Sequence, residues 1–182
     1  NIFVAEAKKQ LFGEVGIDSI AGPSEILILA DSSSNPETIA WDLMAQSEHD
    51  SDASSVLISD SVEVIANVKE IISTEIDSLE RCSIIKESIR SNGLIIKIDH
   101  FSEAKQLINK IAPEHLHLAF DHDNYQDENS LIAGLIMKGE NSANSFSDYV
   151  LGPSHILPTN SSSRFSSPLS VEDFIVSYSY VS

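Results

Sequence analysis

Gln46 and His49 have the chemistry and the spacing of a ligand-binding pair. They stand three positions apart near the end of residues 36–49, whose apolar residues recur at helical spacing, so the two side chains project from neighbouring positions on one side of a helix. An imidazole nitrogen suits zinc and an amide oxygen adds a weaker contact, but two such groups do not complete a tetrahedral site. The alternative is that both are ordinary polar residues at a frayed helix end.

Glu114 and His115 place an acid and an imidazole side by side, after Ala112-Pro113 and at the boundary between a predicted helix and a predicted strand. Histidine titrates near neutral pH and can take and return a proton within one turnover, while a neighbouring carboxylate can orient a water or hold the imidazolium. The pair therefore indicates proton transfer. The alternative is a proline that ends a helix, followed by two solvated residues.

Residues 138–168 are rich in Gly, Asn, Ser and Pro and are too many for a mere connector, which is typical of a functional loop. Within them, Asp148 is a candidate third metal ligand and His155 supplies a second imidazole. Each has an ordinary alternative when taken singly, a turn aspartate for the first and a hydrogen-bonded loop histidine for the second. The remaining histidines receive no role: His100, His117 and His122.

The elements that must position these residues alternate between helix and strand. Asn35-Pro36 is a good helix start, because asparagine caps free N–H groups and proline suits the first helical position. Residues 2–11 form an amphipathic pattern with Phe3, Ala7 and Leu11 on one face. The other predicted helices are 36–49, 62–79, 84–91, 101–111 (capped by Ser102) and a short one after Ser170, and the predicted strands are 26–30, 55–59, 94–98, 116–120 and 134–137.

Continuous apolar strands separated by helices are typical of the α/β class. We therefore expect a mainly parallel sheet with helices on both faces, an incomplete Rossmann-like domain. In such a sheet, ligands gather outside the carboxyl ends of the strands, which is where we expect the polar motifs to meet.

Composition excludes several classes of protein. Eleven Lys and Arg against 28 Asp and Glu give a formal charge of −17, which fits neither nucleic-acid binding nor an anionic membrane surface. No apolar run approaches a membrane span and the first residues lack a signal peptide, so we expect a cytoplasmic protein. The one cysteine, Cys82, cannot form an internal disulfide, and its helical spacing with Ile85 and Ile89 indicates a core residue.

Several different short motifs are distributed along nearly the whole chain, and their order is more specific than any one of them. They are residues 1–8 (NIFVAEAK), 21–25 (AGPSE), 45–49 (AQSEH), 112–116 (APEHL), 148–149 (DY), 152–159 (GPSHILPT) and 164–167 (RFSS). The ordered set resembles histidinol dehydrogenase, the zinc enzyme that ends histidine biosynthesis. This resemblance implies oxidation of L-histidinol to L-histidine by two successive hydride transfers to NAD, through an aldehyde that stays bound.

The resemblance also implies roles for the candidate residues. Gln46, His49 and Asp148 would hold zinc. His115 would be the general base, and Glu114 would activate the water that attacks the aldehyde. Histidinol carries an imidazole and an amine, both good zinc ligands, so the metal can fix the substrate while the cofactor carries the hydride.

Substrate, cofactor and partner contacts follow from the same resemblance. Ser24 and His155 would contact histidinol, and Asn1, as the last residue of a glycine-rich Gly-Pro-Gly-Asn segment, would contact NAD. A C-terminal tail beyond Ser182 is expected to supply a histidine as fourth zinc ligand and a substrate-binding glutamate across the interface of a homodimer. We therefore expect the chain to be a fragment that is inactive alone.

The chain departs from the family pattern in the loop that carries Asp148. Ser147 stands where a glycine usually precedes the Asp-Tyr pair, Ser154 replaces the usual asparagine before His155, and residues 140–144 are an atypical lead. These departures concern the geometry of the loop more than the identity of its ligands.

Three parts of the chain are predicted: the end of a nucleotide-binding lobe (1–20), an α/β zinc and substrate domain (21–160) and the start of a C-terminal arm (161–182). The alternative function is a non-catalytic, acidic metal-binding or interaction module on the same α/β core. A metal-dependent hydrolase, in which zinc beside Glu114 activates water, is a weaker third reading.

Overall fold

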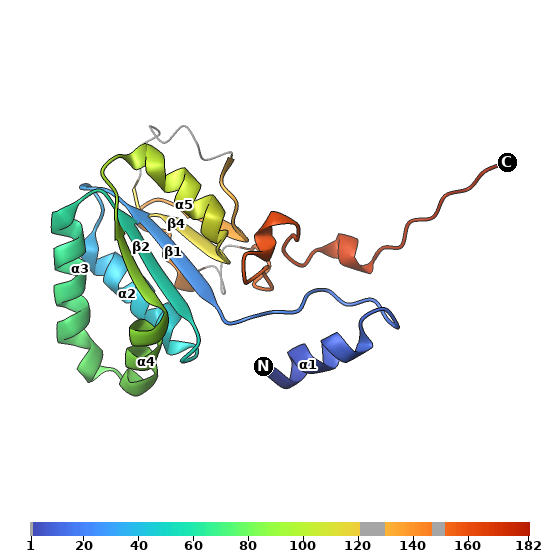
Figure 1. The fold of residues 1–182 in the computed structure, drawn as a ribbon, viewed down its shortest axis with the longest axis horizontal. Helices are drawn as coiled ribbons and strands as arrows, with labels where there is room; N and C mark the ends of the chain where they lie inside the picture. The colour runs from blue at the N-terminus through green and yellow to red at the C-terminus, as the bar shows by residue number, and fades with distance from the viewer. Residues whose placement is uncertain (1, 121–129, 147–151) are drawn as a thin grey trace.

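A five-stranded parallel sheet forms the centre of the fold (Figure 1). The computed structural model describes residues 2–120, 130–146 and 152–182. The strands are β1 (Glu25–Ala30), β2 (Ser54–Ser59), β3 (Gly93–Lys97), β4 (His115–Leu118) and β5 (Leu135–Lys138), in the spatial order β3-β2-β1-β4-β5. Every pair of neighbouring strands is parallel, which confirms the predicted α/β class.

Helices cover both faces of the sheet. Successive residues of a strand point to opposite sides, so a continuous apolar strand such as β1 must be buried on both. The main helices are α2 (Pro36–Glu48), α3 (Val62–Glu75), α4 (Cys82–Asn92) and α5 (Ala104–Ile111). On one face, Ile28 of β1 packs with Leu43 of α2 and Val68 of α3. On the other face, Leu29 of β1 packs with Ile108 of α5. The central strand β1 is buried on both sides, as its continuous apolar sequence predicts.

Helix α2 begins where the sequence predicts. The Asn35 side chain accepts a hydrogen bond of 2.9 Å from the backbone N–H of Glu37, and Pro36 occupies the first helical position. The helix ends at Glu48 with His49 as its C-cap. Its buried face carries the predicted apolar residues together with three polar ones: Ile39, Ala40, Leu43, Met44, Asp42, Gln46 and Ser47.

The ends of several helices and strands differ from the predicted ones. Ser102 does not cap the helix predicted at 101–111, because a short 3-10 turn (η2, Phe101–Glu103) precedes α5 and the Glu103 carboxylate accepts the backbone N–H of His100 at 3.0 Å. The last turn of the helix predicted at 62–79 is likewise a 3-10 turn, η1 (Ile76–Ser78). Strands β3 and β4 begin one residue before the predicted strands and end earlier, since Ile98 and Phe120 stay buried after their strand has ended, whereas β5 begins and ends one residue later than predicted. Cys82 is only half-buried.

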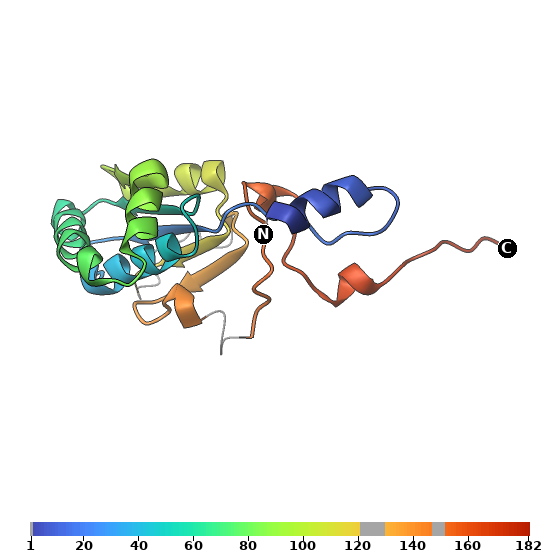
Figure 2. The same ribbon diagram turned by 90° about the horizontal axis from the view of Figure 1, so that it is seen from below.

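Helix α1 and the C-terminal segment both lie beyond the sheet on the side away from α3, and the C-terminus extends farthest from it (Figures 1 and 2). Helix α1 (Ile2–Leu11) has no buried residue, so its predicted apolar face is exposed, with Phe3 81% accessible. An ion pair of 2.5 Å between Lys8 and Asp18 ties α1 to the loop that follows it. Near the other end, Ser170 and Asp173 cap the short turn η6 (Val171–Phe174), as predicted. Among the described residues, no helix has the length and apolarity to cross a bilayer.

Candidate active site

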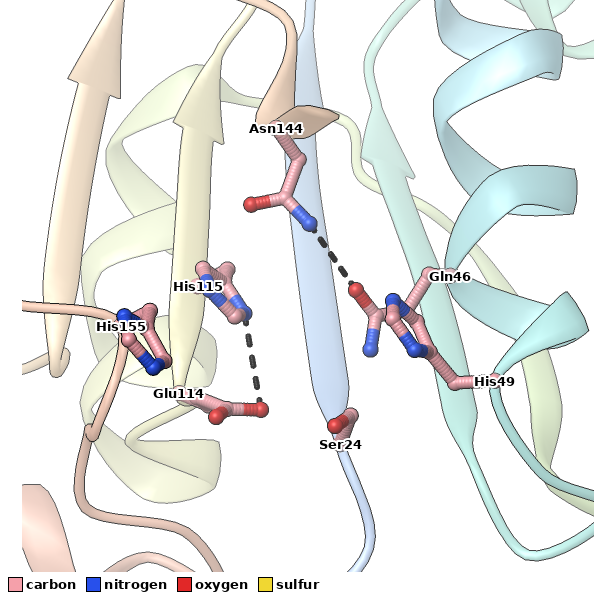
Figure 3. A pocket seen from close by; sticks show the side chains of 7 residues that line it. All are labelled: Ser24, Gln46, His49, Glu114, His115, Asn144 and His155. Carbon is pink, nitrogen blue, oxygen red and sulfur yellow. Dashed lines mark hydrogen bonds and ion pairs between the residues drawn. The ribbon is translucent and has the colours of Figure 1, made fainter. Parts of the chain in front are cut away.

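The predicted site residues surround one cavity of about 320 Å³ (Figure 3). Its lining consists of Ser24, Gln46, His49, Glu114, His115, Asn144 and His155. All but Asn144 carry a predicted role. Two further predicted residues, Asp148 and Asn1, lie outside the described residues. The fold therefore brings together all the predicted site residues that lie within the described part of the chain.

The cavity lies at the amino ends of the strands. The prediction that the polar motifs meet at the carboxyl ends is therefore wrong. Ser24 immediately precedes β1, Glu114 immediately precedes β4, and His49 closes α2 before the chain turns into β2. Figure 3 shows Ser24 and Glu114 at the starts of their strands. Each helix of a parallel sheet runs back to the amino edge, so residues that follow a helix, such as Glu114 and His49, must gather there.

Helix α2 presents Gln46 and His49 to the cavity from its C-terminal turn. Their spacing of three residues puts them on one side of the helix, as predicted. The carbonyl end of a helix carries partial negative charge, which favours a cation beside it. Gln46 is 1% exposed, whereas His49 is exposed and accessible from the cavity. This end of α2 thus combines an imidazole, an amide and a field that favours positive charge.

The amide of Gln46 offers a test of whether these residues fit a metal ion. Its Oε1 accepts a hydrogen bond of 2.9 Å from Asn144 Nδ2, while its Nε2 is buried and has no hydrogen-bond partner within the described residues. A buried amide nitrogen without an acceptor is costly. If both amides turn by 180°, their mutual bond is kept with the donor reversed, and the Gln46 atom that faces away from Asn144 is then its oxygen. An amide oxygen beside an imidazole is a donor set that zinc accepts.

The described part of the chain does not contain a complete set of metal ligands. Among residues 2–120, 130–146 and 152–182, no three His, Cys, Asp or Glu side chains converge as a metal site. Gln46 and His49 are an incomplete set in themselves, as their chemistry predicts.

His115 is held in a defined orientation at the start of β4. Its Nδ1 lies 3.1 Å from the backbone carbonyl oxygen of Glu25, and 3.5 Å from Oε2 of Glu114. A carbonyl oxygen only accepts, so Nδ1 carries the proton and donates to Glu25. In the neutral imidazole, the basic nitrogen is therefore Nε2. This arrangement prepares His115 to take a proton at Nε2.

Glu25 and Glu114 tie β1 to β4 beneath the cavity. Glu114 Oε2 accepts the backbone N–H of Glu25 at 2.9 Å, and Glu25 Oε2 accepts the backbone N–H of Glu114 at 3.3 Å. Burial raises the pKa of the Glu25 carboxyl above its ordinary value, and the charge of Glu114 raises it further, while hydrogen bonds from the backbone N–H groups of Asn160 and Glu114 lower it. The site thus holds two neighbouring carboxyl groups, of which Glu114 is buried and Glu25 is half-buried.

The segment that carries His155 is fixed to the same edge of the sheet. The Asn160 backbone N–H donates to Glu25 Oε1 at 3.0 Å, and Thr159 Oγ1 accepts the backbone N–H of Gly22 at 2.6 Å. A side chain at Gly22 would have its Cβ 2.0 Å from Asn160 Nδ2, so any residue other than glycine there would displace the Asn160 side chain. These contacts place His155 across the cavity from Gln46 and His49 (Figure 3).

Sequence reasoning missed a buried pair, Asp42 and His117, that does not line the cavity. His117, to which the sequence assigns no role, is 0% exposed, and its Nδ1 lies 3.0 Å from Oδ2 of Asp42, which is 3% exposed. The spacing of Asp42, Gln46 and His49 along one helical face could have identified Asp42 as a site residue. His117 could have been placed by strand alternation, because it faces the same side of β4 as His115.

A family model for histidinol dehydrogenase matches residues 1–182. The chain belongs to the histidinol dehydrogenase family. It is 47% identical to the histidinol dehydrogenase of Clostridium acetobutylicum over 181 residues, which are 100% of this chain and 42% of that protein. The histidinol dehydrogenase of Hydrogenovibrio crunogenus is 47% identical over 174 residues, 96% of this chain and 40% of that protein.

A solved member of the histidinol dehydrogenase family has the same fold. The crystal structure of histidinol dehydrogenase from Elizabethkingia anophelis superposes with a TM-score of 0.86 at 34% identity, over 95% of this chain and 40% of that chain. The resemblance inferred from the motifs is therefore confirmed. The chain spans about two-fifths of the length of the curated relatives it matches.

Proposed function

We propose that the protein is a zinc-dependent histidinol dehydrogenase, which oxidises L-histidinol to L-histidine with NAD. The observation that carries this proposal is the convergence of Ser24, Gln46, His49, Glu114, His115 and His155 on one cavity, from β1, α2, β4 and the segment after residue 151. Family membership supplies the reaction, and the convergence supplies groups for its proton transfers and its substrate contacts.

Gln46 and His49 would hold the metal, with Asp148 as a third ligand. The buried Gln46 amide and the C-terminal end of α2 support this assignment. Bound zinc would fix the imidazole and the amine of histidinol and so orient the carbon to be oxidised.

His115 is the proposed general base. Each hydride that leaves a carbinol carbon must be matched by a proton that leaves its oxygen, and Nε2 of His115 can accept that proton because Nδ1–H is held by the Glu25 carbonyl. Glu114 is the proposed activator of the water that attacks the aldehyde. Its carboxylate lies 3.5 Å from the His115 ring, so the two can serve the same reacting carbon.

The remaining roles concern substrate and cofactor. Ser24 and His155, on different segments of the cavity wall, are the proposed substrate contacts. NAD would supply the hydride acceptor, with Asn1 as a contact. Because the net charge of −17 disfavours anionic polymers and surfaces, it fits an amine substrate better than a nucleic acid.

We also propose a cytoplasmic homodimer. Apolar side chains are exposed on α1, just after it and along the C-terminal segment, among them Phe3, Phe12, Phe174, Val176 and Tyr178. So many exposed apolar side chains on these segments support the proposal that they are covered by a second copy of the protein. Light scattering behind a sizing column would give the mass: a monomer at all concentrations would contradict the proposal.

The function is tested by feeding histidinol and NAD to the full-length zinc-loaded protein and following NADH. We expect turnover in the wild type, and loss of both bound zinc and turnover in His49→Ala. His100→Ala is the matched control, since His100 lies at η2 outside the cavity lining. No NADH from the wild type, or a His49→Ala protein with wild-type zinc content and rate, would overturn the proposal.

A further inference from the structure

A buried pair of hydrogen-bonded side chains, Asp42 and His117, is connected to the proposed metal ligand Gln46 through Asn144. Asp42 and His117 are 3% and 0% exposed, and the His117 ring is bonded at both nitrogens, through Nδ1 to Asp42 Oδ2 at 3.0 Å and through Nε2 to the carbonyl oxygen of Gly139 at 2.9 Å. A buried charged or polar side chain is tolerated only when it is paired and hydrogen-bonded, and this pair meets that condition. Neither residue lines the cavity.

The pair anchors both ends of the turn that follows β5. His117 holds Gly139 at the start of this turn, and the Asp42 carboxylate accepts the backbone N–H of Asn144 at its end, at 3.1 Å to Oδ1 and 3.2 Å to Oδ2. Gly139 has a φ of 103°, a left-handed conformation that lets the chain reverse there. The position of Asn144 is thus set by α2 and β4 rather than by its own loop alone.

Asn144 is in turn hydrogen-bonded to Gln46. Its side-chain amide meets the Gln46 amide at 2.9 Å between Nδ2 and Oε1, and both residues are buried. Figure 3 shows the two amides facing each other across the upper part of the cavity. A glutamine side chain has three rotatable bonds, so a metal ligand of this type gains most from a partner that fixes its amide plane.

We propose that Asn144, held by the buried Asp42–His117 pair, is a positioning residue that orients the Gln46 amide toward the metal. This inference rests on the proposed function, because it takes Gln46 as a metal ligand. It adds three residues to the site that the sequence motifs leave out: Asp42, His117 and Asn144. The alternative role for the network is structural, that is, to fix the turn after β5 without any effect on metal binding.

The first test is zinc affinity, measured on the full-length protein by competition with a chromophoric chelator. Asn144→Ala removes only the amide, since the backbone N–H bonded to Asp42 remains. Loss of a residue that supports a metal ligand typically weakens metal binding by about 10- to 100-fold, and we expect a loss in that range. In a Gln46→Ala background, Asn144→Ala should cause no further loss, because Asn144 acts through Gln46.

The second test compares two substitutions at Asp42. Asp42→Asn keeps an oxygen for the Asn144 backbone N–H and an amide for the His117 ring, so zinc affinity should stay within about threefold of wild type, whereas Asp42→Ala should lose about as much as Asn144→Ala. Ser88→Ala is the matched control. Ser88 is 0% exposed and donates to the Ala53 carbonyl at 2.8 Å, so this variant removes a buried hydrogen bond in α4, outside the cavity lining.

Each outcome bears on one claim. If the wild type binds no zinc, or His49→Ala binds it equally well, the proposed function fails. If zinc binding depends on His49 but Asn144→Ala has wild-type affinity, or if Asn144→Ala and Gln46→Ala weaken binding additively, the positioning role alone is overturned. A loss of affinity in Ser88→Ala as large as in Asn144→Ala would also overturn it, since general destabilisation would then explain both.

Discussion

Glu25 and Glu114 each cap the backbone N–H of the other, at 2.9 Å and 3.3 Å. The exchange joins the first residue of β1 to the residue before β4 and holds two carboxylates together at the amino edge of the sheet. Burial disfavours the ionised form of the Glu25 carboxyl, and the charge of the neighbouring Glu114 adds to this cost. The pKa of Glu25 is accordingly raised above 4.5, first by burial.

Glu25→Gln should therefore change stability in a pH-dependent way. A carboxyl whose pKa is higher in the folded state binds more protons when folded, so its contribution to the free energy of unfolding falls as pH rises above 4.5 and through the raised value. Glutamine does not titrate. We expect the variant to gain stability relative to wild type as pH rises across this window, measured by urea unfolding at a series of pH values. A difference that falls with pH would contradict the burial argument.

Asn35→Ala should destabilise the protein by about 1 kcal/mol, because it removes the side-chain acceptor for the Glu37 N–H at the start of α2. Ser73→Ala is a control in an exposed position of α3, where the Ser73 hydroxyl donates to the Glu70 carbonyl, and it should change stability by less than about 0.5 kcal/mol. Denaturant unfolding of the three proteins gives both differences. Equal stability of Asn35→Ala and wild type would show that the cap is replaced by water.

Local patterns were sufficient to predict α2 and the sheet. Asn35-Pro36 marks the helix start, and the run at residues 26–30 reads as a strand buried on both faces, because these features depend on neighbours in the chain. The grouping of the motifs at one edge of the sheet was predicted as well, both from the α/β pattern and from the family resemblance. The edge at which they meet was predicted wrongly, since a general rule for the carboxyl ends of strands was applied to residues that follow helices.

Strand alternation gives the face of β4 on which His117 lies, but the hydrogen-bond partners of Asn144 and His117 could not be predicted, because these bonds join residues far apart in the sequence. Asn144 meets Gln46 across 98 positions of sequence, and His117 meets Asp42 across 75. No local period relates such residues. Their partners become evident only when the strand order places β4 beside β1 and the turn after β5 against α2.

His115→Asn should slow the oxidation of both histidinol and histidinal by about 10²-fold or more, because the same base serves both half-reactions. The asparagine amide can still donate to the Glu25 carbonyl, so the site should keep its shape. Zinc content and histidinol affinity should be nearly unchanged. The measurement is NADH formation by the full-length protein from each substrate, with zinc determined on the same samples. A rate loss that tracks loss of zinc would remove the assignment of His115 as base.

Glu114→Gln should instead separate the two half-reactions. Water enters only after the first oxidation, so loss of the carboxylate that activates it should slow histidinal oxidation much more than histidinol oxidation. Glutamine retains an oxygen that can accept the Glu25 N–H, which keeps β1 and β4 joined at this point. Single-turnover NADH formation from each substrate gives the two rates separately, and His115→Asn provides the comparison in which both fall. Equal slowing of the two substrates by Glu114→Gln would assign Glu114 a part in holding the site together, through its bond to Glu25, rather than in activating water.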